Sequence, residues 1–285
     1  MPPWRWPRWR WSSNLPPSVH PHPPTMNDNQ PEPGVRFDQE RWALFLDFDG
    51  TLVDIAPRPD AVRVEPSLLP VLDTLRQRLG GALAIVSGRP ITVLDQFLAP
   101  HRFDAAGLHG LEHRLAENLF PCRPEDHPGL RDGIERLKTQ FPAETGIIIE
   151  DKLCSVGIHW RLAPLLADRA REAAQSLAGE LGSDYRIQFG KAVAEILPAA
   201  SGKGRIIEKF LAQPPYAGRL PVFIGDDLTD ENGFEVVNAR DGLSVRVGEG
   251  ATIAHYRIAS PAKLRQCLTE WAEGRLFEIG TRIRT

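Results

Sequence analysis

Residues 43–55, ALFLDFDGTLVDI, join an apolar run to two aspartates, Asp47 and Asp49. Positions i and i+2 of an extended strand point to the same side, so the two carboxylates would share one face. At ~4 Å and an effective dielectric of about 20 they would repel each other by about 4 kcal/mol unless a cation or a shared proton intervenes. The competing interpretation is a pair of turn or helix-cap aspartates before Gly50. A calcium loop is excluded, because Gly50 and Leu52 do not fit the EF-hand spacing and no glutamate follows at its last ligand position.

From about Arg41 the chain alternates apolar strands with helical segments. The sequence predicts strands within residues 42–47, 81–90, 103–110, 219–227 and 243–248. It predicts helices at residues 66–79, 92–98 and 202–212. Strands that are apolar throughout and alternate with helices indicate a parallel sheet covered on both faces. The predicted fold is therefore α/β, with a doubly wound, Rossmann-like parallel-sheet core.

Polar side chains follow several of these strands. Asp47 and Asp49, then Ser87, and then Asp226 and Asp227 each come at or just after the end of a predicted strand. In doubly wound sheets, ligands bind beyond the carboxyl ends of the strands. We therefore expect one site to collect all of these side chains.

The middle of the chain has a different pattern. Two predicted helices alternate with two stretches that resemble antiparallel strand pairs, at residues 129–141, 145–161, 168–181 and 185–197. Two helix-plus-hairpin units indicate a compact α+β insertion, which we interpret as a cap domain that acts as a lid.

The predicted segments follow from these patterns. They are a disordered Trp/Arg/Pro-rich tail at residues 1–39, the first part of the core at 40–113, the cap at 114–195 and the second part of the core at 196–285. The tail has no apolar periodicity and cannot bury enough surface to offset its ordering entropy. We interpret the tail as a dispensable extension, with Met26 as an alternative start, rather than as a cationic arm that touches a membrane. We expect the cap to hinge near residues 112–115 and 195–199.

Composition excludes several classes of partner. The chain has 34 basic and 37 acidic residues, so no bulk charge points to nucleic acid or an anionic membrane. No apolar run approaches the ~20 residues that span a bilayer. Cys122, Cys154 and Cys267 show no C-x-x-C spacing, so we expect free thiols in a reducing cytoplasm. The expected protein is a cytoplasmic monomer without stable membrane association.

A second acidic cluster lies in the stretch GDDLTDE, residues 225–231. It does not fit a calcium loop, because Leu228 occupies the third position. Taken alone, it could be a solvated acidic turn. Together with Asp47 and Asp49 it would supply hard oxygen ligands of the kind that suit Mg²⁺, which binds its substrates through phosphate.

Lys203 stands at the start of a predicted helix, where the helix dipole disfavours a cation. A bound anion explains this placement, since helix N-termini also bind phosphate. A P-loop is excluded, because it would need glycine at Leu197 and serine or threonine at Gly204. Ser87 could be an ordinary turn serine, or it could offer its hydroxyl and nearby N–H groups, including that of Gly88, to the same phosphate.

In this order, DFDGT, SGR, the lysine of SGKG and GDD resemble the four motifs of the haloacid dehalogenase (HAD) superfamily of phosphatases, over almost the whole chain from Arg41. The resemblance implies a HAD-type core in which Asp47 is the nucleophile and forms an aspartyl phosphate. It implies that Asp49 is the proton donor and later the base, and that Ser87 and Lys203 hold the phosphoryl group. The implied Mg²⁺ ligands are Asp47, the carbonyl group of Asp49 and Asp226, supported by Asp227 and Asp230.

Further stretches resemble the family of trehalose-6-phosphate phosphatases. They are DIAPRPDAV, GLHGLE, EDKLCSVGIHWR, AEILP, GDDLTDENGFEVVN and VRVGEGATIAHYRI. In that family the cap recognises the distal glucose, and the matching positions are Glu150, Lys152 and Glu195. Carboxylates and an ammonium group suit sugar hydroxyls, because charge-assisted hydrogen bonds are the stronger ones. The remaining candidates for substrate binding are Arg89, His109 and Arg161.

Two departures from the family pattern concern the loop before the lysine. Gly202 stands where serine is expected, and Ala199–Ala200 replace a more polar turn. The leading hypothesis is Mg²⁺-dependent hydrolysis of trehalose 6-phosphate to trehalose and phosphate, in trehalose biosynthesis. The alternatives are a related phosphatase for sucrose 6-phosphate or a glycosyl-phosphoglycerate, and a non-catalytic sugar-phosphate sensor.

Overall fold

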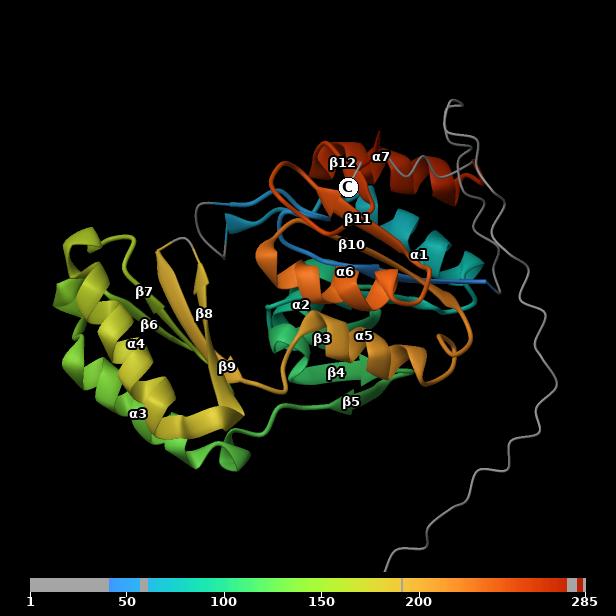
Figure 1. Ribbon diagram of the computed structural model, residues 1–285. Coiled ribbons are helices and arrows are strands. Elements are labelled where there is room, and N and C mark those ends of the chain that lie inside the picture. Colours follow the sequence, from blue (N-terminus) through green and yellow to red (C-terminus); the bar gives the residue numbers. More distant parts are fainter. Residues whose placement is uncertain (1–40, 57–60, 191, 276–280, 284–285) are drawn as a thin grey trace, which may run out of the picture. The chain divides into compact units, whose positions relative to one another are not determined.

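The computed structural model describes residues 41–56, 61–190, 192–275 and 281–283. The tail predicted at residues 1–39 lies outside this range. The described residues form a nine-stranded sheet and a four-stranded sheet, which we call the core sheet and the cap sheet (Figure 1). None of the described helices is both long and apolar enough to cross a membrane.

The core sheet confirms the predicted parallel arrangement. Its strand order is β13-β12-β11-β10-β1-β2-β3-β4-β5, and the six strands from β12 to β3 are parallel. The strands are β1 (Trp42–Leu46), β2 (Leu83–Val86), β3 (Asp104–Gly107), β4 (Glu112–Leu115), β5 (Asn118–Phe120), β10 (Leu220–Gly225), β11 (Leu243–Val247), β12 (Tyr256–Ile258) and β13 (Thr281–Arg282). The central strand β1 is buried throughout, because both faces of the sheet are covered.

Helices on both faces make the core sheet doubly wound. They are α1 (Leu68–Arg78), α2 (Ile91–Leu98), α5 (Lys203–Leu211), α6 (Glu231–Asn238) and α7 (Pro261–Ala272). Helices α1 and α7 pack together, and α5 and α6 pack together (Figure 1). Right-handed crossovers explain the two faces, because the chain moves in one direction from β1 to β3 and in the other from β10 to β12.

The cap sheet has its own hydrophobic cluster. Its order is β6-β7-β9-β8, all antiparallel. Its elements are α3 (Pro128–Gln140), β6 (Ile148–Asp151), β7 (Val156–His159), α4 (Ala167–Leu181), β8 (Tyr185–Gly190) and β9 (Val193–Pro198). Both predicted helix-plus-hairpin units are therefore present. The two helices cover one face of the sheet, and the cluster between them includes Leu130, Val156 and Ile196.

The edges of the cap sequence differ from the predicted boundaries. Strand β4 pairs antiparallel with β3, and β5 pairs antiparallel with β4, so both extend the core sheet. The predicted boundaries at 113/114 and 195/196 consequently fall inside β4 and β9. A hinge at residues 112–115 would have to disturb a strand paired on both sides. Residues 121–127 and 199–202 are connections that lie outside both sheets and suit a hinge better.

The prediction of three free thiols is wrong for two of them. Cys122 and Cys154 form a disulfide, with their Cα atoms 6.5 Å apart, while Cys267 is buried and free. The β6–β7 turn carries Cys154 to the connection that follows β5, where Cys122 lies. Thirty-two positions separate the two residues, so only the tertiary structure brings them within bonding range.

Candidate active site

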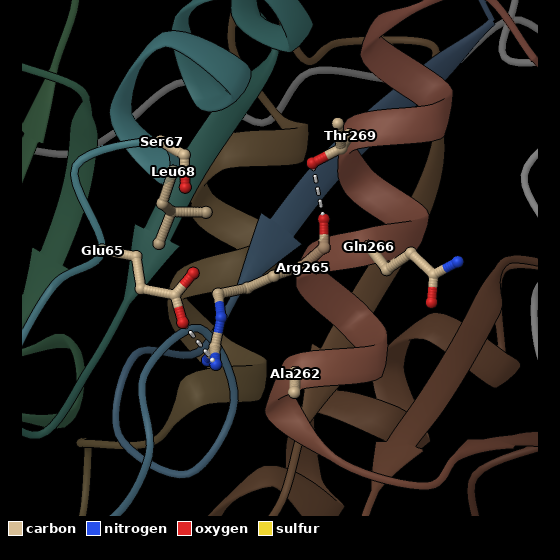
Figure 2. A pocket seen from close by; sticks show the side chains of 7 residues that line it. All are labelled: Glu65, Ser67, Leu68, Ala262, Arg265, Gln266 and Thr269. Atoms are coloured by element: carbon tan, nitrogen blue, oxygen red, sulfur yellow. Dashed lines mark hydrogen bonds and ion pairs between the residues drawn. The ribbon is translucent and has the colours of Figure 1, made fainter.

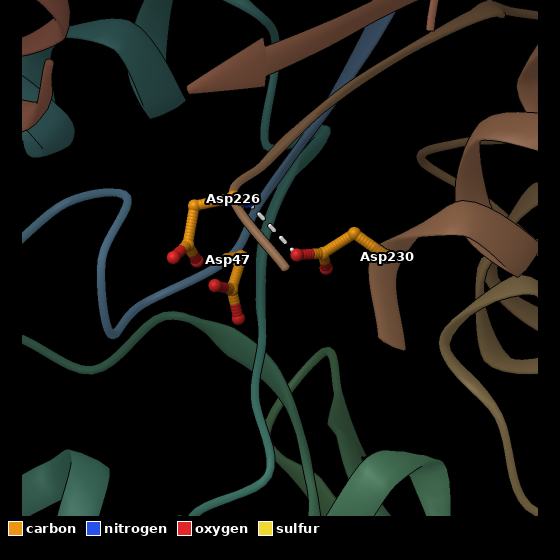
Figure 3. A group of neighbouring side chains, drawn as sticks. All are labelled: Asp47, Asp226 and Asp230. Carbon is orange, nitrogen blue, oxygen red and sulfur yellow. Dashed lines mark hydrogen bonds between the residues drawn. The ribbon is translucent and has the colours of Figure 1, made fainter. Parts of the chain in front are cut away.

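Three carboxylates converge at the carboxyl edge of the core sheet. Asp47 follows β1, Asp226 follows β10, and Asp230 ends the short helix η7 (Leu228–Asp230). Each offers an oxygen atom, and these atoms lie within 4.8 Å of one another. Figure 3 shows the carboxylates of Asp47 and Asp226 next to each other, with that of Asp230 on the other side of Asp47. We call these three residues the carboxylate cluster. The closeness of Asp47 and Asp226 confirms that the ends of β1 and β10 meet at one place.

Lys203 neutralises part of the carboxylate cluster. It is the first residue of α5, and its Nζ lies 2.6 Å from Oδ1 of Asp47 and 2.6 Å from Oδ1 of Asp230. Only 3% of Lys203 is exposed. Burial by itself would lower the pKa of Lys203, but the carboxylates of Asp230 and Asp47 outweigh it and raise the pKa. The side chain therefore stays a cation that can hold an anionic group beside Asp47.

The close approach of the carboxylates changes their acidity. Burial, with the charges of Asp226 and Asp227, raises the pKa of Asp47 to about 7 despite Lys203. Burial and the charges of Asp230 and Asp227 raise the pKa of Asp226 to about 6. Carboxylates that share a site in this way are stabilised in their ionised form by a cation. The donor set is made of hard oxygen atoms and fits Mg²⁺.

The backbone around the cluster is shaped for this approach. Gly50 has φ +76°, and a Cβ atom there would lie 2.1 Å from Oδ2 of Asp226. Only glycine lets the Asp226 carboxylate lie against the loop that follows Asp49. Thr51, which the sequence analysis missed, donates from Oγ1 to Asp47 at 3.2 Å and to Asp226 at 3.4 Å. Its place inside the DFDGT motif was the available signal.

Asp230 and Asp227 play different structural parts. Oδ2 of Asp230 accepts from the N–H groups of Asp226 and Asp227, both at 2.9 Å. With Lys203 on its other oxygen, Asp230 is already satisfied and holds the loop rather than offering a free ligand atom. Oδ1 of Asp227 accepts from N–H and Oγ1 of Thr229, at 2.8 and 2.6 Å, and caps η7. The residues best placed to hold a metal ion are Asp47 and Asp226.

The side chain of Asp49 is held by arginine. Nε and Nη2 of Arg89 donate to Oδ2 and Oδ1 of Asp49, at 2.6 and 2.7 Å. The Arg89 guanidinium also lies over the rings of Phe48 and Phe97, at 5.9 and 5.1 Å. A bidentate pair of this kind fixes direction as well as distance. The structure thus brings Arg89 to the site through Asp49.

Ser87 follows β2 and is buried. Its Oγ accepts from the N–H of Arg89 at 3.1 Å, and its own N–H donates to the carbonyl of Ala106 at 2.9 Å. Two of the nearby N–H groups are therefore used inside the protein. The hydroxyl hydrogen of Ser87 remains able to donate to an anion.

A second polar network lies on the cap sheet. Nζ of Lys152 is 3.2 Å from Oε1 of Glu195 and 3.7 Å from Oε2 of Glu150, and Nε2 of His159 is 2.8 Å from the same Glu150 oxygen. We call Glu150, Lys152, His159 and Glu195 the cap network. Burial would raise the pKa of Glu195, but His109 and Lys152 outweigh it and lower the pKa. The hydrogen bond from His159 lowers the pKa of Glu150. Both carboxylates are thus held as hydrogen-bond acceptors.

His109 connects the two networks. Its ring packs against Gly88, and its Nε2 lies 3.6 Å from Oε2 of Glu195. Its backbone has φ +55°, an unfavourable conformation for a residue with a side chain, which persists where the surroundings enforce it. Arg161, by contrast, is exposed beyond the end of β7, and the structure does not bring it into the cap network.

Gly202 explains one departure from the family pattern. Its backbone has φ +152° and ψ +144°, a region that is essentially restricted to glycine. In this conformation its N–H donates to the carbonyl of His109 at 2.8 Å. A serine would be strained here, so the loop before Lys203 has a backbone conformation that glycine allows and serine does not.

Away from these two networks, a cavity of about 260 Å³ lies between the N-terminus of α1 and α7 (Figure 2). Arg265 lines it and is paired with Glu65 at 3.0 Å and Asp54 at 3.1 Å. The same guanidinium donates to the carbonyl of Leu52 at 3.1 Å. This cavity therefore carries paired charges that brace the loop after Asp49, and it offers no isolated charge to a ligand.

Comparisons with known proteins agree with this geometry. A family model described as trehalose-phosphatase matches residues 45–262. A "probable trehalose-phosphate phosphatase" of Sinorhizobium fredii is 47% identical over 218 residues, which cover 74% of this chain and 79% of that protein. The trehalose-6-phosphate phosphatase of Escherichia coli is 40% identical over 219 residues, covering 77% and 82%.

A solved structure also matches. The crystal structure of a trehalose-6-phosphate phosphatase related protein superposes with a TM-score of 0.66 and 26% identity, covering 81% of this chain and 97% of that one. The resemblance to trehalose-6-phosphate phosphatases, inferred from stretches such as DIAPRPDAV, GLHGLE and EDKLCSVGIHWR, is confirmed over most of the chain. The chain therefore belongs to the trehalose-phosphatase family.

Proposed function

We propose that the protein hydrolyses trehalose 6-phosphate to trehalose and inorganic phosphate through an aspartyl phosphate on Asp47. One observation carries the proposal. His109 packs on Gly88 of the SGR motif and also approaches Glu195, so a network suited to phosphoryl transfer adjoins one suited to sugar hydroxyls. The names of the relatives at 40% and 47% identity support the same substrate.

Two chemical steps follow from the residues of the carboxylate cluster. In the first, a carboxylate oxygen of Asp47 attacks phosphorus while the bond to the sugar oxygen breaks and Asp49 donates a proton to that oxygen. In the second, Asp49 takes a proton from a water molecule, which attacks phosphorus and releases phosphate from Asp47.

Charge control is the main requirement of both steps. Lys203 and the hydroxyl of Ser87 hold phosphoryl oxygens, while Asp230 keeps Lys203 and the loop of Asp226 in place. Mg²⁺ bound at Asp47 and Asp226, with the Asp49 carbonyl, would offset the charge of the phosphate and of the transition state. The Arg89–Asp49 pair must open for Asp49 to reach the sugar oxygen.

We assign recognition of the distal glucose to Glu150, Lys152 and Glu195. The domain assignment also stays a proposal, with the cap closing over bound substrate through the connections at 121–127 and 199–202. Scattering that detects no compaction with a phosphate-mimicking inhibitor would count against this closure. Monomeric state and cytoplasmic location remain predictions, and the Cys122–Cys154 disulfide would be unusual in a reducing compartment.

A substrate panel tests the proposal. Phosphate release is measured from trehalose 6-phosphate, glucose 6-phosphate, sucrose 6-phosphate and glucosyl-phosphoglycerate, each with Mg²⁺, with EDTA, and with the Asp47→Asn protein. The expected result is strong release from trehalose 6-phosphate alone, lost with EDTA and in the variant. Preference for another sugar phosphate would keep the mechanism and replace the substrate. No release from any compound would support a non-catalytic sensor.

A further inference from the structure

A row of polar side chains crosses the cap sheet on the face turned away from α3 and α4. The strand register places Glu150 opposite Gly157, Gly157 opposite Glu195, and Glu195 opposite Gln188. Directly opposed residues share a face of a sheet and lie close enough to interact. The next residue of β9, Ile196, points the other way into the apolar cluster under the helices. Gln188 therefore belongs to the same polar face as the cap network.

Arg186 sets the orientation of the Gln188 amide. Nη1 of Arg186 donates to Oε1 of Gln188 at 3.2 Å. A guanidinium has donors only, so the amide oxygen faces Arg186 and the amide nitrogen faces away from it. The Gln188 residue is half-buried, and among the described residues its amide nitrogen has no hydrogen-bond acceptor. It is a donor of fixed direction beside Glu195.

Arg186 is itself held from the core side. Its Nη2 donates to the carbonyl of Ser201 at 3.5 Å, in the segment that leads to Lys203. The two oxygen atoms that accept from Arg186 are both neutral, one on the cap sheet and one on the segment entering α5. The hydrogen bonds of Arg186 therefore hold Gln188 in one orientation, while the Glu195 carboxylate is close enough to act on the charge of Arg186 through space.

The cap network offers few donors to a sugar. The carboxylates of Glu150 and Glu195 can only accept hydrogen bonds, and the ammonium group of Lys152, which contacts both of them, has one of its three N–H donors left for a sugar oxygen. Sugar hydroxyls both donate and accept, and the ring and bridging oxygens of a disaccharide accept only. A complete site needs a further donor next to the acceptors, and the amide nitrogen of Gln188 is in that position.

We propose that Gln188 is a specificity-determining residue for the distal sugar, donating from its amide nitrogen to a sugar oxygen while Glu195 accepts from a hydroxyl. Arg186 is the positioning residue that fixes the direction of this amide. The inference rests on the proposed function, since it concerns the non-reacting sugar of the same substrate.

Steady-state kinetics with two substrates test the assignment. Trehalose 6-phosphate carries the distal sugar, and p-nitrophenyl phosphate does not. In Gln188→Met, a change that keeps the length of the side chain, KM for trehalose 6-phosphate should rise about five- to tenfold with kcat within about twofold. kcat/KM for p-nitrophenyl phosphate should stay unchanged. The matched control is Gln175→Met, an exposed glutamine on α4, which should change neither substrate.

A double-mutant cycle tests whether Arg186 acts by positioning Gln188 or only by supporting the fold of the cap. Arg186→Met should raise KM for trehalose 6-phosphate by a smaller factor than Gln188→Met. Added to Gln188→Met, it should raise KM by less than about twofold, because the hydrogen bond by which Arg186 acts goes to Gln188. Independent, multiplying effects would overturn the role of Arg186.

The outcomes distinguish the two proposals. If the wild-type protein does not hydrolyse trehalose 6-phosphate, the proposed function fails. If the wild-type protein is active and Gln188→Met leaves KM unchanged, only the assignment of Gln188 is overturned. Equal losses on both substrates would also overturn it, since they would indicate damage to the carboxylate cluster.

Discussion

Lys203 in the core and Lys152 in the cap each bind two carboxylates, but water reaches the two groups to different extents. The side chain of Lys203 is 3% exposed, and its partners Asp47 and Asp230 are 6% and 0% exposed. The side chain of Lys152 is 18% exposed, and its partners Glu150 and Glu195 are 41% and 10% exposed. The first network is closed to solvent, and the second can exchange hydrogen bonds with water or with a ligand.

This difference matches the two tasks proposed for the networks. Phosphoryl transfer needs charges that are fixed and desolvated, because electrostatic stabilisation is strongest where water is excluded. Sugar recognition needs hydrogen-bonding groups that can give up water for hydroxyls at small cost. Breaking a buried pair leaves an uncompensated charge, whereas breaking an exposed pair costs little. Substitutions in the core network should therefore affect chemistry and stability, and those in the cap network should affect binding.

The largest effect is expected for Asp49→Asn in the core. An amide cannot transfer a proton, so kcat for trehalose 6-phosphate should fall by about 10²- to 10⁴-fold. p-Nitrophenolate leaves without a proton, so p-nitrophenyl phosphate should still give a burst of product followed by slow turnover. Stopped-flow absorbance measures both phases. Asp73→Asn, which changes a surface carboxylate on α1, is the control and should behave like the wild type; equal loss of burst and turnover would contradict the role of Asp49.

Lys203→Met tests the buried network through stability. Removal of the cation leaves Asp47 and Asp230 as buried, unpaired carboxylates, so the free energy of unfolding should fall by about 3–5 kcal/mol. Urea denaturation followed by circular dichroism measures the change. Lys209→Met, at an exposed position on the same helix, should cost less than about 1 kcal/mol. A similar cost for both lysines would remove the contrast between the networks.

Lys152→Met tests the cap network through binding. KM for trehalose 6-phosphate should rise about 10- to 100-fold, because a charge-assisted hydrogen bond to the sugar and the pairing of two carboxylates are lost. Stability should fall by about 1–2 kcal/mol, less than in Lys203→Met, because the buried Glu195 keeps Ser155 and His109 as partners. kcat/KM for p-nitrophenyl phosphate should not change. Lys138→Met on α3 serves as the control. A large loss of stability would show that Lys152 is structural.

The smallest effect concerns pH and His113 on β4 of the core. Burial, with the charge of Lys209, lowers the pKa of His113 to about 4 from 6.5. Since the folded protein keeps this side chain neutral, its contribution to stability is complete above pH 6.5 and is lost as the pH falls from there toward 4.

The expected size of this pH effect is modest. Between pH 7 and 5.5 the wild type should lose about 1 kcal/mol of stability that His113→Asn does not lose. Urea midpoints at both pH values measure this difference, with His101→Asn as the control. Parallel losses in the wild type and in His113→Asn would contradict the assignment.

Much of the core could be predicted from sequence because its signals are local. Apolar runs marked β1, β2, β10 and β11, and the rule that strand ends meet at one edge of the sheet was enough to place Asp47 beside Asp226. Neither β4 nor β5 was predicted as part of the core sheet, because EHRL and NLF carry no clear strand pattern. β4 pairs with β3 and β5 with β4, and this pairing rather than a sequence pattern makes them strands.

The sequence by itself determined the parallel core, the helix-plus-hairpin cap and the residue types that meet at the strand ends. Only the tertiary structure decided that Asp230 rather than Asp227 joins the carboxylate cluster, that Arg89 holds Asp49, that Cys122 pairs with Cys154, and that Gln188 lies opposite Glu195. The physical reason is one of range. Strand and helix patterns arise from neighbours within a few residues, whereas these contacts depend on side-chain directions and strand registers that only the packed fold sets.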